Sequence, residues 1–409
     1  MKIGIIGAGV TGLALGRLLS SKFNVEILES SNKIGGIAST KTINDVTYHT
    51  IGGHCLNSKH KEVLDFIFDI IPKNNFNQII RDAKILFKNY YIRYPIEFAI
   101  KEIYNIDKKI AFNITKDFLS TSNENSNNLE EWFINNFGDT LAQEYLIPYN
   151  TKIWNNDLQN MNYDWVIDKL PTPSPYDFFE SLMNYKSDDM PHATFFYPVT
   201  NNQNDFLSAL ANDLNIVLNC KVTKIMKNSK KWIVNDSYKY DILINTSPLN
   251  NLFDLIYDAP ADIKSYAQLL KYNKVTTMLW ESNSQDFSWL YIPSQEIKFH
   301  RVINIGKFFL PNKNYMITEA IGEIDYNTME AIGKKLDFLI KPIGHNISEH
   351  AYVVFDNNTN NVKKILMEYL DSIGMITVGR FGEWEYYNMD ICIKKALEVF
   401  NRLVTQYES

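Results

Sequence analysis

The chain opens with apolar runs separated by glycines, a pattern that predicts a strand, a tight turn, a helix and a second strand. Lys2–Ile6 has the short apolar run of a buried strand, and Leu13–Leu19 has helical spacing after a glycine-rich turn. A second apolar run, Asn24–Leu28, predicts another strand and is followed by Glu29. The first 29 residues therefore predict one strand, turn, helix, strand and acid unit.

The middle of the chain has a different periodicity. From about residue 100 to residue 190, apolar residues recur at three- and four-residue spacing, which predicts helices. Leu129–Phe137 and Thr140–Leu146 show this spacing most clearly. The segments that break the pattern and predict turns or loops are 121–128, Pro171–Pro175 and 185–192.

The pattern returns to strands after residue 215. Residues 275 to 355 alternate in the manner of a separate antiparallel sheet, most clearly in Val275–Trp280 and Tyr315–Glu319. A final helix is expected from near Asp390 to about Val404. The strands expected before this sheet are Ile216–Leu218, Lys221–Ile225, Trp232–Val234 and the buried run that ends in a turn within Asp241–Pro248.

The turn Gly7–Gly12 has the GxGxxG spacing of a dinucleotide site. Gly7 allows the tight turn, Gly9 lets the backbone approach a pyrophosphate, and Gly12 lets the helix pack closely on the strand. The helix N-terminus presents unpaired N–H groups to that anion. Glu29 can accept hydrogen bonds from ribose hydroxyls, which disfavours a cofactor with a phosphate there. The alternative is a glycine-rich turn without a ligand.

A second pair of glycines decides which dinucleotide is expected. Gly35 and Gly36 offer another bare stretch of backbone soon after the acid. Nicotinamide-binding folds seldom add this feature, whereas flavoproteins of the amine-oxidase and mutase type do. The sequence therefore predicts FAD rather than NAD.

The expected fold class is α/β, with a Rossmann-like FAD-binding domain that is discontinuous in sequence. An inserted helical domain and an antiparallel β-sheet substrate domain complete the prediction, because the chain of such folds leaves the dinucleotide domain and re-enters it. The predicted divisions are 1–80, 200–255 and 365–409 for the FAD-binding domain, 98–190 for the helical substrate or lid domain, and 81–97, 191–199 and 256–364 for the sheet domain.

Composition excludes several classes of function. A chain of 409 residues with 45% apolar content can bury a large core. The net charge of −6 and the absence of a basic run argue against a nucleic-acid partner. No run of about twenty apolar residues predicts a membrane span. We expect a soluble, cytoplasmic protein, since three scattered cysteines fit a reducing compartment and have no metal-binding spacing.

Arginine is rare in this chain, because six of the 41 basic residues are arginine and lysine supplies the rest. A retained arginine is therefore a candidate for the planar fork that grips phosphate with two hydrogen bonds. Arg93, Arg301 and Arg380 are the candidates. The alternative for each is a surface or structural salt bridge.

A histidine follows the dinucleotide unit in the segment Thr50–His54, directly after two glycines. This position is where the chain returns toward the isoalloxazine ring, and Gly53 would let His54 lie against the flavin. The alternative is a satisfied core histidine. We expect flavin contact.

Four further segments make a specific resemblance. In their order along the chain they resemble the UDP-galactopyranose mutases, especially the eukaryotic-type and related bacterial forms, and the last segment is the most diagnostic. The resemblance covers most of the chain as islands. The segments are Tyr90–Pro95, Pro148–Trp154, Phe299–Arg301 and Gly379–Asp390.

The resemblance implies interconversion of the pyranose and furanose forms of a nucleotide sugar for surface glycan synthesis. In that family reduced FAD attacks the anomeric carbon through its N5 atom, expels the diphosphate, and carries the sugar as a covalent adduct while its ring opens and recloses. The implied partners are a nucleoside-diphosphate sugar and a reductant, such as NAD(P)H, for the flavin. Homo-oligomers are common among such relatives.

The resemblance also assigns residues. His54 matches the family histidine beside the flavin, and Arg301 matches an arginine that holds the substrate pyrophosphate. Arg380 matches the arginine of the C-terminal motif, near the flavin and the diphosphate, and Tyr386 matches a tyrosine that reaches the diphosphate. Asn388 and Asp390 open the last helix, whose dipole would favour anionic reduced flavin. The residues expected to contact FAD are Gly7, Gly9, Gly12, Glu29, Gly35, Gly36, Gly53, Val222, Asn388 and Asp390.

The remaining family matches are expected to contact the substrate. Aromatic residues among them have the alternative of being core aromatics. The full set of expected substrate-binding residues is Arg93, Tyr94, Asn150, Lys152, Trp154, Arg301 and Tyr386, of which Arg301 and Tyr386, with His54 and Arg380, are also the expected catalytic residues.

The sequence departs from the family pattern at Tyr197–Asn202, where a diglycine usually follows Tyr-Pro, and at Cys55–Asn57 after the histidine. Both departures bear on the identity of the substrate. Two other functions share the N-terminal unit: an FAD-dependent oxidase or dehydrogenase of the amine-oxidase type, and a flavin-holding protein of a glycan assembly complex that has lost catalysis. Oxygen consumption would favour the oxidase.

Overall fold

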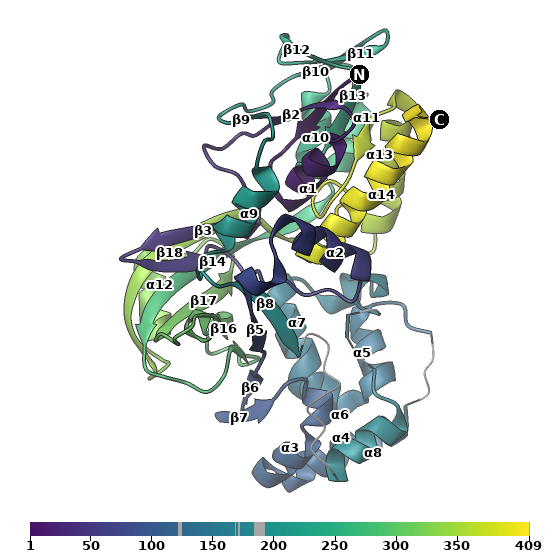
Figure 1. Ribbon diagram of the computed structural model, residues 1–409. Coiled ribbons are helices and arrows are strands. Elements are labelled where there is room, and N and C mark those ends of the chain that lie inside the picture. The colour runs from purple at the N-terminus through teal and green to yellow at the C-terminus, as the bar shows by residue number, and fades with distance from the viewer. Residues whose placement is uncertain (122–124, 168, 171, 184–192, 409) are drawn as a thin grey trace.

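The computed structural model describes residues 1–409 apart from 122–124, 168, 171, 184–192 and 409 (Figure 1). The loop expected at 185–192 lies outside the described residues. So do residues 122–124 of the loop expected at 121–128, and Pro171 of the expected break at Pro171–Pro175.

A five-stranded parallel sheet forms the dinucleotide unit, with β1 at its centre. The apolar residues of β1 alternate between the two faces, so that Ile3 and Ile5 lie in one core and Ile6 in another. Burial on both faces is the arrangement expected of a parallel sheet. In sheet order, the strands are β19 (Ile376–Thr377), β13 (Ile242–Asn245), β1 (Lys2–Ile6), β2 (Asn24–Leu28) and β9 (Ile216–Val217).

Separate groups of elements cover the two faces of this sheet. On the face of Ile3 and Ile5 lie the helices α1 (Val10–Leu19), α2 (Lys61–Ile70), α9 (Gln203–Ala211) and α14 (Met389–Glu408). The face of Ile6 packs against a three-stranded antiparallel sheet, β10 (Ile225–Asn228), β11 (Lys231–Val234) and β12 (Tyr238–Tyr240), and against the helices α10 (Leu249–Leu255), α11 (Ala261–Ala267) and α13 (Thr359–Ile373).

A seven-stranded sheet lies beside the dinucleotide unit (Figure 1). The predicted antiparallel sheet is mixed, because β15 and β6 run parallel. The helix α12 (Tyr326–Gly333) follows β17. In sheet order, the strands are β18 (Leu339–Val354), β14 (Lys271–Ser282), β17 (Tyr315–Ile321), β16 (Phe299–Ile303), β15 (Trp289–Tyr291), β6 (Ala83–Phe87) and β7 (Tyr90–Arg93).

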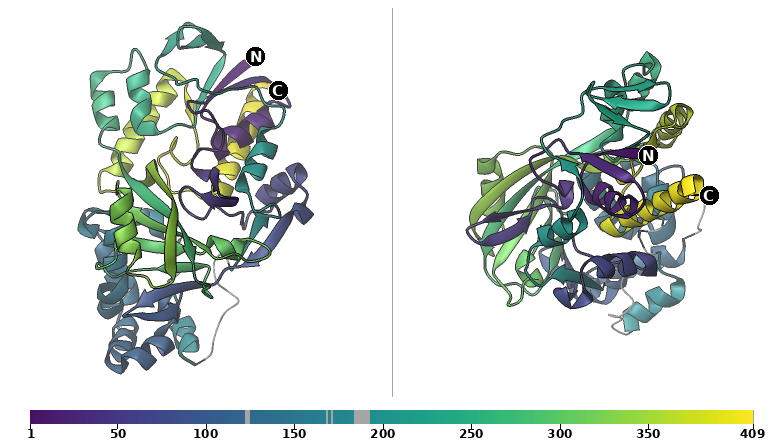
Figure 2. Two further views of the ribbon diagram at one scale, coloured as in Figure 1. Left: turned by 90° about the vertical axis from the view of Figure 1, so that its left-hand side faces the viewer. Right: turned by 45° about the horizontal axis from the view of Figure 1, so that its top comes forward.

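A group of helices forms the end of the molecule away from both termini (Figure 2). The predicted helix Leu129–Phe137 is present as α5 with the same bounds. The expected helix at Thr140–Leu146 is instead α6 (Asp139–Leu141) followed by a π-helical turn at Ala142–Leu146. The other helices here are α3 (Ile100–Ile106), α4 (Lys108–Leu119), α7 (Ile147–Trp154) and α8 (Pro175–Met183).

Two small antiparallel sheets join these parts. The first pairs β3 (Thr40–Ile43) with β4 (Val46–His49), and the second pairs β5 (Phe76–Ile80) with β8 (Thr194–Pro198). Short 3-10 turns complete the secondary structure: η1 (Gly36–Ala38), η2 (Lys73–Asn75), η3 (Ile96–Phe98), η5 (Leu158–Asn160), η6 (Asp164–Val166) and η7 (Ile305–Phe308).

The expected strand Lys221–Ile225 is wrong, because β10 begins only at Ile225. Just before this segment, the backbone N–H of Cys220 donates a hydrogen bond to the carbonyl of Glu29 at 2.8 Å. The chain therefore crosses the end of β2 here before it turns into β10. The predicted fold class is confirmed: an α/β protein with a Rossmann-like domain discontinuous in sequence, a helical region and a mixed sheet.

Candidate functional site

A cavity of about 660 Å³ lies between the dinucleotide unit and the seven-stranded sheet. The glycine turn, the segment after β4, the strands β16 and β18, and the start of α14 all contribute to its wall. The expected site residues that line it are Gly7, Gly9, Glu29, Gly35, Gly36, Gly53, His54, Arg301, Arg380, Tyr386, Asn388 and Asp390.

The glycine turn after β1 has the geometry that its sequence predicts. Gly7 has a φ of +100°, a conformation that side chains disfavour. A Cβ on Gly12 would lie 2.0 Å from the Gly7 carbonyl oxygen, so the absence of a side chain lets α1 pack against the turn. A Cβ on Gly9 would meet no atom within 4 Å. Gly9 thus leaves room on the cavity side, at the N-terminus of α1.

The second glycine pair lies directly against the first turn. The N–H of Gly35 donates to the Ala8 carbonyl at 2.7 Å, and a Cβ on Gly36 would lie 3.3 Å from the Gly9 Cα. The two bare stretches of backbone therefore border the same part of the cavity. This cradle of backbone at a helix N-terminus fits the pyrophosphate of a dinucleotide.

Glu29 reaches the same turn from the end of β2. Its Oε2 accepts a hydrogen bond from the Ala8 N–H at 2.8 Å, and its Oε1 accepts one from the Ser31 N–H at 2.8 Å. The side chain is held in place while lining the cavity. Val222 is different, because it is buried in the core with Leu28 and is absent from the cavity wall.

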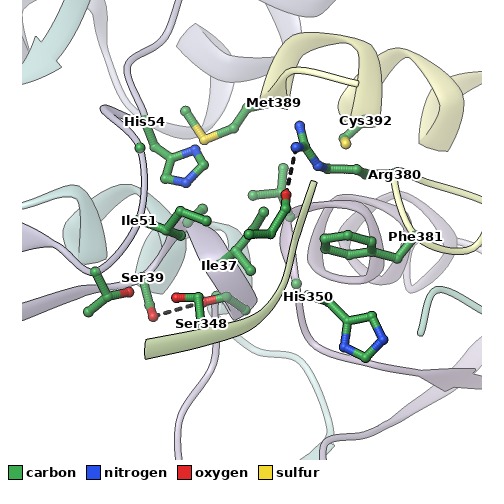
Figure 3. Close-up of a pocket in the computed structure, with 18 of the residues that line it drawn as sticks. Ile37, Ser39, Ile51, His54, Ser348, His350, Arg380, Phe381, Met389 and Cys392 are labelled. Atoms are coloured by element: carbon green, nitrogen blue, oxygen red, sulfur yellow. Dashed lines mark hydrogen bonds between the residues drawn. The ribbon is translucent and has the colours of Figure 1, made fainter. Parts of the chain in front are cut away.

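His54 lies in the loop after β4 and faces the same space as Met389 and Arg380 (Figure 3). Its Nε2 is buried and has no hydrogen-bond partner. Burial lowers the pKa of His54 to about 4, and the positive charges of Arg380 and Arg301 act in the same direction. The imidazole is therefore neutral at neutral pH, with one ring nitrogen available to a ligand.

Arg301 on β16 is held by a buried acid on the neighbouring strand. Its Nε donates to Glu319 of β17, and its Nη2 donates to the Tyr352 hydroxyl at 2.8 Å. Glu319 also accepts a hydrogen bond from the N–H of Gly52. Burial would raise the pKa of Glu319, but the Arg301 charge outweighs it and lowers the pKa far below its usual range. The result is a fixed guanidinium at the cavity wall.

Arg380 enters the cavity from the turn before α14. Its Nη1 and Nη2 donate to the carbonyls of Tyr387 and Ala351, both at 2.9 Å. The guanidinium carbon lies 4.5 Å from the ring centroid of Tyr386, which is a cation–π distance. Arg380 therefore joins the C-terminal segment to β18 across the cavity (Figure 3).

Arg93 and Tyr94, both expected to contact the substrate, are absent from the cavity wall. Arg93 is buried and lies 3.4 Å from the Glu102 carboxylate. The ring of Tyr94 lies 4.7 Å from that of Tyr291. The contacts of Arg93 are therefore those of a structural ion pair, which is the alternative given for it in the sequence analysis.

The three expected residues of α7 also lie behind the cavity wall. Lys152 donates to the backbone carbonyls of Ile292, Ser294 and Phe299, and burial lowers its pKa to about 7. Asn150 accepts a hydrogen bond from the Trp154 indole at 3.1 Å. The Lys152 contacts fasten α7 to the loop between β15 and β16 and to Phe299, the first residue of the strand that carries Arg301.

Sequence reasoning missed three polar residues of this region: Arg81, Glu319 and Tyr352. Arg81 and Tyr352 line the cavity, and Glu319 supports Arg301 from behind. The scarcity of arginine, which made Arg93, Arg301 and Arg380 candidates, applies to Arg81 as well. Glu319 and Tyr352 had no local signal, since their roles depend on strand pairing.

Among the described residues, no cluster of histidine, cysteine, aspartate and glutamate has the arrangement of a metal site. Nor does the described part of the chain contain a helix with the length and apolar character needed to cross a membrane.

Comparisons with known proteins agree with this architecture. The model of the NAD(P)-binding Rossmann-like domain matches residues 5–69. The structure of a reduced UDP-galactopyranose mutase is 21% identical, has a TM-score of 0.87, and aligns over 100% of this chain and 96% of its own.

Two other solved structures share the fold at lower similarity. A putative protoporphyrinogen oxidase from Exiguobacterium sp. 255-15 is 14% identical with a TM-score of 0.77, covering 99% of each chain. A CLA-producing fatty acid isomerase from P. acnes is 15% identical with a TM-score of 0.66, covering 99% of this chain and 98% of its own. The chain therefore has the fold of a UDP-galactopyranose mutase structure, built around an N-terminal Rossmann-like dinucleotide domain.

Proposed function

We propose that this protein is a flavin-dependent nucleotide-sugar mutase, which interconverts the pyranose and furanose forms of a nucleoside-diphosphate sugar for surface glycan synthesis. One observation carries the proposal. Arg301 and Arg380, which lie on separate elements, line the same cavity as His54 and the glycine cradle. A dinucleotide site that shares its cavity with two guanidiniums suits a second, anionic ligand beside the cofactor.

The residues of the cavity fit FAD. Gly9 and Gly36 leave bare backbone where a pyrophosphate would lie, and Glu29 is placed at the end of β2 for the ribose. His54, Asn388 and Asp390 are the residues that would lie near the flavin ring. Reduced FAD supplies an electron-rich nitrogen that can attack the anomeric carbon of a sugar.

The chain's own residues would bind the substrate and stabilise its leaving group. Arg301 and Arg380 each present a guanidinium, and Tyr386 presents a phenol, to the diphosphate. Glu319 orients Arg301 without leaving the core. Neutral His54 adds no positive charge beside the cofactor. Charge that develops on the departing diphosphate would thus meet preorganised donors.

The decisive experiment measures both cofactor and product. The purified protein is expected to be yellow, with flavin absorbance that is lost on denaturation and filtration. The flavin-loaded protein is then incubated with a panel of nucleotide sugars, with and without dithionite, and furanose products are sought by NMR. We expect furanose formation only in the reduced sample, and a physiological reductant such as NAD(P)H should replace dithionite.

The same experiment separates the other functions. An oxidase of the amine-oxidase type would consume oxygen in proportion to substrate and form no furanose. A flavin-holding protein without catalysis would be yellow, yet His54→Ala and Arg301→Ala would change neither ligand affinity nor any activity. A colourless protein that takes up no flavin would end the proposal.

A further inference from the structure

Arg81 is a third guanidinium in the cavity wall, at the end lined by Trp289. It precedes β6, and its guanidinium carbon lies 4.9 Å from the Trp289 ring centroid and 5.8 Å from that of Tyr94. Its Nη2 donates a hydrogen bond to the Tyr291 hydroxyl at 2.6 Å. Aromatic rings and one hydroxyl therefore hold the guanidinium in a defined orientation.

The charge of Arg81 lacks a carboxylate partner within the described part of the chain. No ion pair joins it to an aspartate or glutamate there, although Arg301 has Glu319 and Arg93 has Glu102. The neighbouring acid, Asp82, pairs with Lys84 at 3.2 Å.

The Nε of Arg81 is buried and has no hydrogen-bond partner among the described residues. A guanidinium removed from water without a counter-charge, and with one N–H unpartnered, is costly. This cost would be recovered if a ligand supplied an oxyanion from the cavity.

The position of Arg81 distinguishes its role from that of Arg301. Tyr291 of β15 pairs with Arg301 of β16 across the sheet, and its hydroxyl accepts the hydrogen bond from Arg81, so one tyrosine neighbours both arginines. Arg380 contacts a different set of groups, at Tyr386 and Ala351. If Arg301 and Arg380 bind the diphosphate, Arg81 is a further cation on the same cavity wall that another part of the substrate can use.

We propose that Arg81 binds a carboxylate carried by the sugar, so that the substrate is a nucleoside-diphosphate uronic acid. This inference rests on the proposed mutase function and defines its substrate class. A carboxylate is planar, and its two oxygens match the fork of a guanidinium. The same fork would also bind a phosphate oxygen, so the experiment must separate these two oxyanions.

The test compares three ligands on the flavin-loaded, reduced protein by calorimetry: UDP-galacturonic acid, UDP-galactose and UDP. The wild type is expected to bind UDP-galacturonic acid most tightly. Arg81→Gln should weaken that ligand by about 10-fold or more, the scale of a hydrogen bond to a charged group, and leave UDP-galactose and UDP nearly unchanged. Arg402→Gln, on the exposed side of α14, removes the same charge elsewhere and is the matched control.

Tyr291→Phe gives a second, milder variant that removes only the hydroxyl holding Arg81. It should reduce the preference for UDP-galacturonic acid over UDP-galactose in the same direction as Arg81→Gln, but less. Flavin absorbance and the thermal midpoint of each variant establish that the site is folded.

The outcomes separate this inference from the proposed function. If UDP binds but UDP-galactose binds as tightly as UDP-galacturonic acid, the inference is wrong while the mutase proposal stands. If Arg81→Gln weakens all three ligands equally, Arg81 binds the diphosphate and the carboxylate assignment is overturned. If the wild type binds flavin but none of the three ligands, the inference is overturned, and the panel of other nucleotide sugars decides the mutase proposal.

Discussion

The two ends of the cavity are built in opposite ways. The dinucleotide end uses residues that are close in sequence, because Gly9, Glu29 and Gly36 all come from the first 36 residues. The other end, which we propose binds the substrate and call the substrate end, collects Arg301 from β16 and Arg380 from the turn before α14, almost eighty residues later. Backbone conformation defines the first end, whereas contacts between residues far apart in sequence define the second.

This difference has an energetic consequence. A glycine cradle depends on the absence of side chains, so a substitution acts through local contacts. The substrate end depends on one buried carboxylate, Glu319, that serves Arg301 and the Gly52 N–H together. Disturbing that single carboxylate should therefore have a larger effect than changing any one glycine.

The largest expected effect is that of Glu319→Ala. The substitution leaves Arg301 without its buried counter-charge, and breaking such a pair costs about 3–5 kcal/mol of the free energy of unfolding. Urea denaturation measures the loss. Glu323→Ala, which removes an exposed partner of Lys274, is the control and should leave the urea midpoint unchanged. Equal midpoints for the two variants would contradict the role of Glu319.

At the dinucleotide end, Gly12→Ala and Gly9→Ala should separate packing from ligand binding. A Cβ at Gly12 meets the Gly7 carbonyl, so this variant should lose about 1–3 kcal/mol of stability through overpacking. A Cβ at Gly9 meets nothing in the protein, so this variant should keep its stability and lose flavin. Chemical denaturation and flavin absorbance measure the two effects. Full flavin occupancy in Gly9→Ala would show that the cofactor pyrophosphate lies elsewhere.

Arg301→Lys and Arg93→Lys should differ although both keep the charge. Lysine cannot reproduce the two-pronged grip of a guanidinium, so Arg301→Lys should weaken nucleotide-sugar binding by about tenfold. Arg93→Lys should leave this affinity unchanged, because Arg93 contacts Glu102 and the Ser181 carbonyl outside the cavity wall. Calorimetric titration compares them. An equal loss in both variants would restore Arg93 as a substrate ligand.

The last expected effect is a pH dependence of stability, set by Glu97 of η3. Burial raises the pKa of Glu97 to about 8, and one of its carboxylate oxygens has no hydrogen-bond partner. Between the ordinary pKa of a glutamate and pH 8, the unfolded chain has released this proton and the folded chain retains it, so stability falls as pH rises.

Glu97→Gln removes this titration. The difference in thermal midpoint between the variant and the wild type should therefore shift in favour of the variant from pH 5 to pH 8. Scanning calorimetry at the two pH values measures the difference. A gain that is the same at both values would show that Glu97 is already ionised in the folded protein.

Much of the dinucleotide end could be predicted from the sequence. The bounds of β1 and β2 and the place of α14 followed from apolar periodicity, and the glycine contacts followed from the GxGxxG spacing. These features are local, because each depends on residues within one turn or one pairing. Val222 is the exception. The strand expected at Lys221–Ile225 begins only at Ile225, and the Val222 side chain packs into the core.

The positions of the residues assigned by the family resemblance follow from the fold, and their roles stay predictions. Arg301 and Arg380 line the cavity, whereas Arg93 and Lys152 make contacts behind its wall. The scarcity of arginine singles out Arg93 and Arg301 equally as candidates for phosphate binding. Nothing local to either residue reveals whether its guanidinium borders the cavity or packs among helices.

The sequence by itself determined the dinucleotide unit, because a glycine turn and the acid after β2 are fixed by backbone geometry over a few residues. Only the tertiary structure decided which charges share the cavity. Strand pairing places Glu319 behind Arg301, and the packing of β15 sets the Trp289 ring beside Arg81, which pairs with no acid in the described ranges. Charge pairing acts between residues far apart in sequence, and so it appears only when the sheets are assembled.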